Sequence, residues 1–280
     1  MGLLVSVLLV GLFSCSKTSI ETLACDTSTP SLYRLNNPSH HIILVMGQSN
    51  THSGIGFNSL LDTISQGVMQ LGRFGKDNLK VIPATLPLQH YTARKNRIGF
   101  GVSFANLYKN EFLKTTDTII MVPCGFGGTG FSDNQWNPGD ELYNDALSRV
   151  TYLLEQYPNS KLQAVLWHQG ENDVGQKNYE NQLRTFMSSL RKDVNAPNVP
   201  IVLGGMVPFW VEKNTDRITL QNLIQEIANT TCATGYADPY LPFIIEKTEN
   251  TSDTIHFDAQ GQRILGIRYF EEYKQLILKP

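Results

Sequence analysis

Short apolar runs rich in β-branched residues alternate in this chain with longer stretches whose apolar residues recur at helical spacing. This alternation restricts the folds open to the chain more than any other feature. The apolar runs are Ile42–Met46, Thr118–Val122, Leu162–Trp167 and Ile201–Met206. The helical stretches are Asp140–Tyr157, Tyr179–Val194, Arg217–Ala228 and Ala259–Leu276. Strands separated by helices form parallel sheets that are covered on both faces. The pattern therefore predicts an α/β fold, a three-layer α/β/α sandwich with a central, mainly parallel sheet.

Composition and charge narrow the class of protein. Of the 280 residues, 41% are hydrophobic and 17% are charged, as in globular proteins. The formal net charge is −2, and no cluster of Lys and Arg provides a surface for nucleic acid or acidic lipids. With no internal repeat and no change in composition, a single domain over 38–280 is the simplest organisation. Its least regular part, 72–100, is expected to be an insertion near the mouth of a site.

The first residues resemble an export signal. Leu3 to Phe13 form an apolar run that is too short to span a bilayer and ends in small residues. The sequence ending at Cys15 resembles a bacterial lipobox, in which the cysteine is lipidated, although Met1-Gly2 carries no basic residue. We therefore expect a signal peptide over 1–15, a polar tether over 16–37, and a lipoprotein at the outer membrane or cell surface, or a periplasmic protein. The alternative is a cleaved signal peptide without an anchor.

Three cysteines remain once Cys15 is assigned to the anchor. Cys25 and Cys232 both lie in segments that look peripheral, and an exported protein permits a disulfide between them. Cys124 ends an apolar run and is expected to be a buried small hydrophobe. The spacing of Cys and His resembles no metal site.

The segment Gly47-Gln48-Ser49-Asn50 directly follows the first apolar run. Ligands of open α/β sheets bind beyond the carboxyl ends of strands, so Ser49 is placed for chemistry. The segment is not a G-x-S-x-G elbow, and a serine at a strand end is often only a turn or capping residue.

A possible base for this serine lies near the C-terminus, in Asp253-Thr254-Ile255-His256. A tight turn with this spacing can bring the carboxylate to Nδ1 of the imidazole and leave Nε2 facing the serine. The pattern is weak alone, but it immediately precedes the last predicted helix.

Two further motifs follow strands. Pro123–Gly130 contains four glycines, whose backbone N–H groups can face a developing oxyanion. No Lys-Ser/Thr follows, which excludes a P-loop. Trp167–Asp173 places Gln169 and Asn172 as candidate amide donors. Its Glu171 and Asp173 form a candidate acid and base for glycoside hydrolysis, but their spacing leaves no partner across a sugar.

Together, G-Q-S-N, G-G-T, W-H-Q-G-E and D-T-I-H resemble the SGNH hydrolases, and most closely the sialate O-acetylesterase-like branch, carbohydrate esterase family six. The resemblance covers about 40–275 and implies a flavodoxin-like fold. It implies Ser49 as nucleophile, His256 as base and Asp253 as the carboxylate that orients His256. It further implies a set of oxyanion donors and a set of supporting residues. The donors are the N–H groups of Ser49 and of Gly127 or Gly128, with the amide of Gln169 preferred over that of Asn172. The supporting residues are Gln48, Asn50 and Glu171.

The function implied is removal of O-acetyl groups from a carbohydrate through an acyl-enzyme, without a metal or organic cofactor. Sialic acid, xylan and other acetylated glycans all remain open as substrates, and the sequence does not indicate the oligomeric state. One alternative is a lipase or thioesterase of the same superfamily acting on longer acyl chains. Another is a carbohydrate-binding lipoprotein without activity. Trp136, Trp167 and Trp210 are candidates for stacking on a sugar, although tryptophans more often lie in cores.

Overall fold

The structure is a computed structural model and describes residues 39–92, 94–247 and 252–278. The predicted signal peptide, tether, Cys15 and Cys25 lie outside the described residues. In the described part, no helix combines the length and the apolar character needed to cross a membrane.

A seven-stranded sheet forms the middle layer, in the order β4-β3-β6-β1-β7-β8-β9. Every neighbouring pair is parallel except β3 with β4 at one edge. The strands are β1 (His40–Gly47), β3 (Val68–Leu71), β4 (Val81–Pro83), β6 (Thr118–Gly125), β7 (Ser160–His168), β8 (Ile201–Gly204) and β9 (Thr234–Ala237). The central strands are buried almost throughout, as expected for a sheet covered on both faces.

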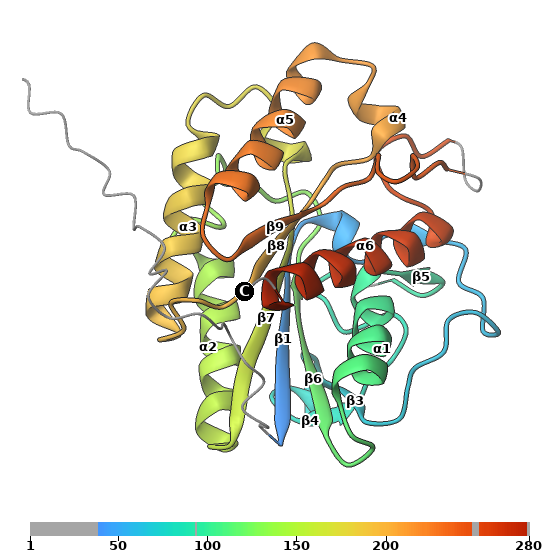
Figure 1. Ribbon diagram of the computed structural model, residues 1–280, viewed down its shortest axis with the longest axis vertical. Coiled ribbons are helices and arrows are strands. Elements are labelled where there is room, and N and C mark those ends of the chain that lie inside the picture. Colours follow the sequence, from blue (N-terminus) through green and yellow to red (C-terminus); the bar gives the residue numbers. More distant parts are fainter. Residues whose placement is uncertain (1–38, 93, 248–251, 279–280) are drawn as a thin grey trace, which may run out of the picture.

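Helices cover the sheet on both faces, which makes the outer layers of the sandwich (Figure 1). On one face, α1 (Phe100–Phe112) packs against α6 (Ala259–Leu278). On the other, α2 (Glu141–Gln156) contacts α3 (Tyr179–Asp193) through Tyr143 and Phe186, and α3 packs against α5 (Thr215–Thr230). The predicted three-layer α/β/α sandwich is confirmed.

Smaller elements complete the described part of the chain. They are the two-stranded sheet of β2 (Gly54–Ile55) and β5 (Arg97–Ile98), the short helix α4 (Pro208–Val211), and the 3₁₀ turns η1 (Ser49–Thr51), η2 (Gly75–Asp77) and η3 (Glu171–Asp173). The 72–100 segment is therefore less irregular than its sequence suggests, since it includes η2, β4 and β5.

The three central strands end side by side. Gly47 at the end of β1 pairs with Gly125 of β6 and with His168 of β7. Gly47 has a φ of +121°, and a Cβ there would lie 2.1 Å from the carbonyl oxygen of His168, so no side chain fits. The segments that follow these strands are consequently brought to one edge of the sheet.

Candidate functional site

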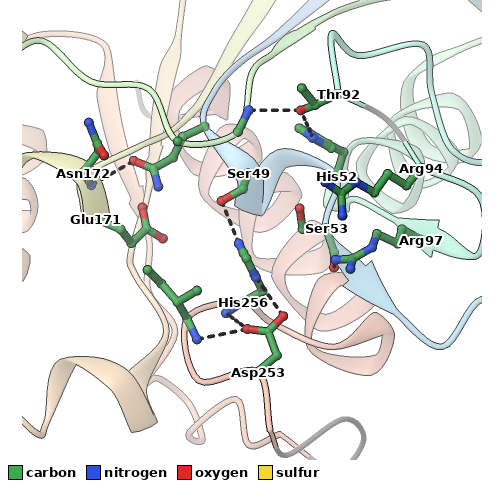
Figure 2. A pocket seen from close by; sticks show the side chains of 14 residues that line it. Ser49, His52, Ser53, Thr92, Arg94, Arg97, Glu171, Asn172, Asp253 and His256 are labelled. Atoms are coloured by element: carbon green, nitrogen blue, oxygen red, sulfur yellow. Dashed lines mark hydrogen bonds and ion pairs between the residues drawn. The ribbon is translucent and has the colours of Figure 1, made fainter. Parts of the chain in front are cut away.

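A cavity of about 420 Å³ opens at this edge of the sheet. It lies among the segments that follow the central strands, the C-terminal turn before α6 and the 92–97 segment (Figure 2). Its lining residues are Gln48, Ser49, His52, Ser53, Thr92, Arg94, Arg97, Gly127, Gly128, Glu171, Asn172, Asp253, Ile255 and His256.

A hydrogen-bonded row of three side chains crosses the cavity floor. The Oγ of Ser49 lies 2.8 Å from Nε2 of His256, and Nδ1 of His256 lies 2.8 Å from Oδ2 of Asp253. The three residues predicted to form a triad are thus brought together from the two ends of the described chain (Figure 2).

The turn that carries Asp253 and His256 is organised by its own carboxylate. Oδ1 of Asp253 accepts the N–H groups of Ile255 and His256, each at 3.2 Å, while Oδ2 is left to orient the imidazole. Burial raises the pKa of Asp253, but hydrogen bonding to His256, its charge, these N–H groups and the cation of Lys247 outweigh burial. The net pKa is lower than usual, so the carboxylate is ionised at neutral pH.

Lys247 stabilises the same turn through its ammonium group. Its ammonium donates to the carbonyl of Asp253, and to that of His256 at 3.0 Å. It also lies 3.9 Å from Oδ1 of Asp253. The cation therefore holds both ends of the D-x-x-H turn, a role that the sequence pattern did not reveal.

Three backbone N–H groups were predicted as oxyanion donors, those of Ser49, Gly127 and Gly128. The N–H groups of Ser49 and Gly128 have no hydrogen-bond acceptor among the described residues, and both residues line the cavity. The N–H of Gly127 instead donates to Oγ1 of Thr92 at 3.1 Å. Of the two predicted glycines, Gly128 therefore has the N–H that is available to a ligand.

The structure does not bring Gln169 into the cavity, and the preference for its amide as an oxyanion donor is corrected. Gln169 is 1% exposed, and its Nε2 donates to Oδ2 of Asp173 at 2.8 Å. Asn172 lines the cavity instead, where its Nδ2 donates to Oδ2 of Asp133 at 2.6 Å. A strand-end amide can face either the cavity or the loop beneath it, and the buried carboxylate of Asp173 directs Gln169 to the loop.

Asp173 has a structural role. It is fully buried and accepts the N–H groups of Phe131 and Ser132, the hydroxyl of Ser132, and the amide of Gln169. These hydrogen bonds hold the 130–132 loop against the segment after β7, and Asp173 does not line the cavity. The arrangement gives no support to Glu171 and Asp173 as a glycosidase pair.

Asn50 and Glu171 connect the nucleophile segment to the C-terminal turn. Nδ2 of Asn50 donates to Oε1 of Glu171 at 2.6 Å and to the carbonyl of Ile255 at 3.0 Å. Its Oδ1 accepts the N–H of Phe257 at 3.1 Å. Burial raises the pKa of Glu171, but His168, which lies 3.6 Å away, and the amide of Asn50 lower it by more. The net pKa of Glu171 is therefore lower than usual, and the carboxylate is ionised.

Gln48, the third predicted supporting residue, is buried beside the nucleophile. Its Oε1 accepts the N–H of Asn172 at 3.2 Å and lies 3.3 Å from Nε2 of Gln169. It therefore joins the segment after β1 to the segment after β7.

Five cavity residues outside the motifs were not identified as site residues from the sequence: His52, Ser53, Thr92, Arg94 and Arg97. His52 and Ser53 follow shortly after Ser49, and the other three belong to the 72–100 segment, whose placement at the mouth of the site was expected. Arg97 donates from Nη1 to the carbonyl of Ser53 at 2.9 Å. The proximity of Arg94 and Arg97 in the sequence was the only available signal for a cationic wall.

The tryptophans and cysteines take structural positions. Trp136 is fully buried, Trp167 is 1% exposed and Trp210 is 8% exposed, and none of them lines the cavity. Cys124 is a buried free thiol, and burial raises its pKa to about 11. Cys232 is disulfide-bonded. Because Cys25 lies outside the described residues, its pairing with Cys232 stays a prediction. Within the described ranges, no three His, Cys, Asp or Glu side chains group as a metal site.

A comparison with curated proteins finds a relative of this chain. A curated relative, a probable carbohydrate esterase of Arabidopsis thaliana, is 27% identical over 186 residues, which are 63% of this chain and 63% of the relative. The chain thus matches somewhat less than two thirds of that relative's length.

Solved structures share the fold. A structure of an Arabidopsis thaliana protein has a TM-score of 0.66 at 22% identity, over 85% of this chain and 98% of that one. NanS has a TM-score of 0.71 at 18% identity, with the same coverage of both chains. A carbohydrate acetylesterase from Xanthomonas citri has a TM-score of 0.59 at 18% identity, over 84% of this chain and 56% of that one.

A family model described as "Carbohydrate esterase, sialic acid-specific acetylesterase" matches residues 39–275. The matched range contains the four motifs and the three residues predicted to form a triad. The chain therefore belongs to the family of carbohydrate esterases described as sialic acid-specific acetylesterases.

Proposed function

We propose that the protein is a serine esterase that removes O-acetyl groups from a carbohydrate. The observation that carries this proposal is the row Ser49–His256–Asp253, with both hydrogen bonds at 2.8 Å on the floor of an open cavity. A nucleophile, a base in contact with it and a carboxylate that fixes the base are the groups needed for acyl transfer.

In the proposed reaction, Oγ of Ser49 attacks the acetyl carbonyl while Nε2 of His256 takes the hydroxyl proton. Asp253 accepts a hydrogen bond from the N–H at Nδ1 of His256 and stabilises the imidazolium that forms. The oxyanion is bound by the N–H groups of Ser49 and Gly128. His256 then protonates the leaving sugar oxygen. A water molecule, activated by the same base, splits the acetyl–serine ester into acetate and free Ser49.

For the substrate, we propose an acetylated sugar that carries a carboxylate. Arg94 and Arg97 form one side of the cavity (Figure 2), whereas its two acidic side chains, Glu171 and Asp253, are engaged by Asn50 and His256. The free positive charge favours an anionic ligand. The family description names sialic acid, which is such a sugar.

The first experiment compares acetate release by the wild type, Ser49→Ala and His256→Ala on 4-nitrophenyl acetate. Each variant should lose nearly all turnover, and their effects should not add, because the two residues act as a unit. Ser252→Ala is a matched control, since this exposed serine lies in the C-terminal turn outside the cavity lining. Wild-type rates in both Ser49→Ala and His256→Ala would refute the triad.

The second experiment measures acetate release from an O-acetylated sialic acid and from a neutral acetylated xylo-oligosaccharide. The acidic sugar should have the higher kcat/KM, and the preference should shrink in Arg94→Gln and Arg97→Gln. An equal or higher kcat/KM for the neutral sugar would contradict the proposal that the substrate carries a carboxylate. The esterase assignment would be unaffected.

We propose further that the protein is exported and anchored through Cys15, on the basis of its lipobox-like sequence alone. Cys15→Ala should move the protein from the membrane fraction to the supernatant of lysed cells. Unchanged membrane association would exclude the anchor.

A further inference from the structure

His52 lies at the centre of a chain of hydrogen bonds between the two segments that supply the oxyanion donors. On one side, Nδ1 of His52 lies 2.7 Å from Oγ1 of Thr51, which donates to the carbonyl of Gln48 at 2.8 Å. On the other side, Nε2 of His52 lies 2.8 Å from Oγ1 of Thr92, which accepts the N–H of Gly127 at 3.1 Å.

The direction of each hydrogen bond in this chain is inferred from the partners of each group. A threonine hydroxyl has one proton, and Thr51 gives its proton to Gln48. Oγ1 of Thr51 must therefore accept from Nδ1 of His52, so Nδ1 carries a proton. Burial, followed by the charges of His256, Arg97 and Arg94, lowers the pKa of His52 to about 3, so the ring is neutral and Nε2 carries no proton. Nε2 then accepts the hydroxyl proton of Thr92, which leaves the lone pairs of Thr92 for the N–H of Gly127.

This hydrogen-bond chain ends on the peptide unit that carries one proposed oxyanion donor and on the peptide unit adjacent to the other. The carbonyl of Gln48 belongs to the same peptide unit as the N–H of Ser49, so a donor to that carbonyl fixes the direction of the N–H and strengthens it as a donor. The N–H of Gly127 belongs to the Phe126–Gly127 peptide unit, which is adjacent to the Gly127–Gly128 unit that carries the N–H of Gly128. Holding Gly127 therefore fixes the loop that presents the free N–H of Gly128.

The surroundings of His52 keep the ring in place. Its side chain is 2% exposed and stacks on His90, with ring centroids 5.0 Å apart and planes at 20°. His90 in turn accepts the N–H of Gly125 on Nδ1 at 2.9 Å. Both ring nitrogens of His52 are occupied by threonine hydroxyls, which distinguishes it from His256, whose Nε2 contacts the nucleophile.

We propose that His52, as the neutral Nδ1–H tautomer, is a positioning residue for the oxyanion hole and acts through Thr51 on Ser49 and through Thr92 on the glycine loop. The inference rests on the proposed esterase function. It assigns no proton transfer to His52, and it gives the 72–100 segment a part in catalysis through Thr92.

The kinetic test uses Thr92→Val, which keeps the shape of the side chain but removes its hydrogen bonds. On 4-nitrophenyl acetate, kcat should fall about tenfold, which is less than the roughly 10²–10³ lost when an oxyanion donor itself is removed. KM should change little, because ground-state contacts are kept. Thr92→Ser restores the hydroxyl and should return kcat to within about twofold of the wild type.

The matched control is Thr85→Val in the same segment. Oγ1 of Thr85 accepts from Gln70 and donates to the carbonyl of Pro87, away from the cavity. This variant should lower the melting temperature without changing kcat. A folded Thr92→Val with wild-type kcat, or a Thr92→Ser as slow as Thr92→Val, would overturn the proposal.

A spectroscopic test is independent of both activity and variant folding. The ¹⁵N chemical shifts of the His52 ring in the wild type at pH 7 should show a protonated Nδ1 and an unprotonated Nε2. The opposite tautomer or an imidazolium would overturn the inference, even in an active esterase. If the wild type has no Ser49-dependent activity, the proposed function fails, whereas the tautomer still reports whether the hydrogen-bond chain exists.

Discussion

Nδ2 of Asn50 donates to the buried carboxylate of Glu171 over 2.6 Å, and this bond joins the segment of the nucleophile to the segment after β7. The same asparagine also bonds the backbone on both sides of His256, at the carbonyl of Ile255 and the N–H of Phe257. One fully buried side chain therefore sets the position of the base relative to the residue that follows Ser49.

From this relationship we predict that Asn50→Ala reduces kcat by about 10²-fold, because a shift of His256 by about 1 Å is enough for a loss of that size. It should also lower the free energy of unfolding by roughly 1–3 kcal/mol, since Glu171 loses a buried donor. Urea unfolding and initial rates check both effects. Asn144→Ala, in which an exposed amide that bonds the carbonyl of Gly139 is removed, is the control. An Asn50→Ala variant with wild-type kcat would contradict this role.

Removing the amide of Gln169 should affect stability, whereas removing the amide of Asn172 should affect turnover. Gln169→Ala takes a donor from buried Asp173 and should cost roughly 1–3 kcal/mol of stability, measured by urea unfolding. Asn172 lines the cavity, so Asn172→Ala should chiefly lower kcat/KM, by at least about tenfold, if its amide turns from Asp133 to the oxyanion. The corrected assignment fails if only Gln169→Ala slows turnover while its stability is unchanged.

Lys247 should matter for turnover although it does not touch the nucleophile. Lys247→Met removes the donor to the carbonyls of Asp253 and His256, so the turn should loosen and kcat should fall roughly tenfold. The pKa of Asp253 should rise, because a cation that lowers it is lost. Lys247→Arg keeps the charge and should recover part of the rate. Equal rates for Lys247→Met and the wild type would show that the turn keeps its conformation without Lys247.

Stability should depend on pH through the buried histidines. Burial, then the charges of His256, Arg97 and Arg94, lowers the pKa of His52 from 6.5 to about 3, and burial lowers the pKa of His90 as well. Between these values the unfolded chain binds more protons than the folded one, so the free energy of unfolding falls as the pH drops from about 6.5 towards 3. The lowered pKa of Asp253 acts in the same direction near the lower end of this range.

Urea unfolding at pH 7 and pH 4.5 measures this dependence. His52→Gln cannot titrate, so its stability should change less between the two pH values than that of the wild type, although His90 still contributes. An identical change in both proteins would mean that His52 is protonated in the folded state. His40, which lies outside the site and is less strongly shifted, provides the control variant His40→Gln.

The sheet was predictable where the strands are long and buried. Ile42–Met46, Thr118–Val122 and Leu162–Trp167 all lie inside strands, whereas Ile201–Met206 extends two residues beyond β8. The edge strands β4 and β9 and the neighbouring β3 were missed for a physical reason. β4 has three residues and β3 and β9 have four each, too few to show a period, and β9 contains Gly235. Helix α1 was missed because Gly99 and Gly101 flank its start and weaken the helical pattern.

The candidate site was predictable where a motif follows a long strand or precedes a helix, as for Ser49, Asp253 and His256. Contacts that depend on how segments meet were not predictable. The direction of Gln169 depends on the buried Asp173, and the chain through Thr92 depends on the 72–100 segment lying along the glycine loop. Distances across such contacts are decided by packing, which leaves no pattern in a single sequence.

The contact between Ser49 and His256 spans 207 residues of chain, and the helix α6 that follows His256 is the surface against which α1 packs. A ribosome adding about 5–20 residues per second makes the serine roughly 10–40 seconds before it makes the base. Throughout that interval the serine lacks its proton acceptor, and once α1 (Phe100–Phe112) has been made, its apolar side lacks its cover. Catalytic competence in this protein is therefore acquired only after α6 has been made, when docking of this helix both buries that surface and delivers the base.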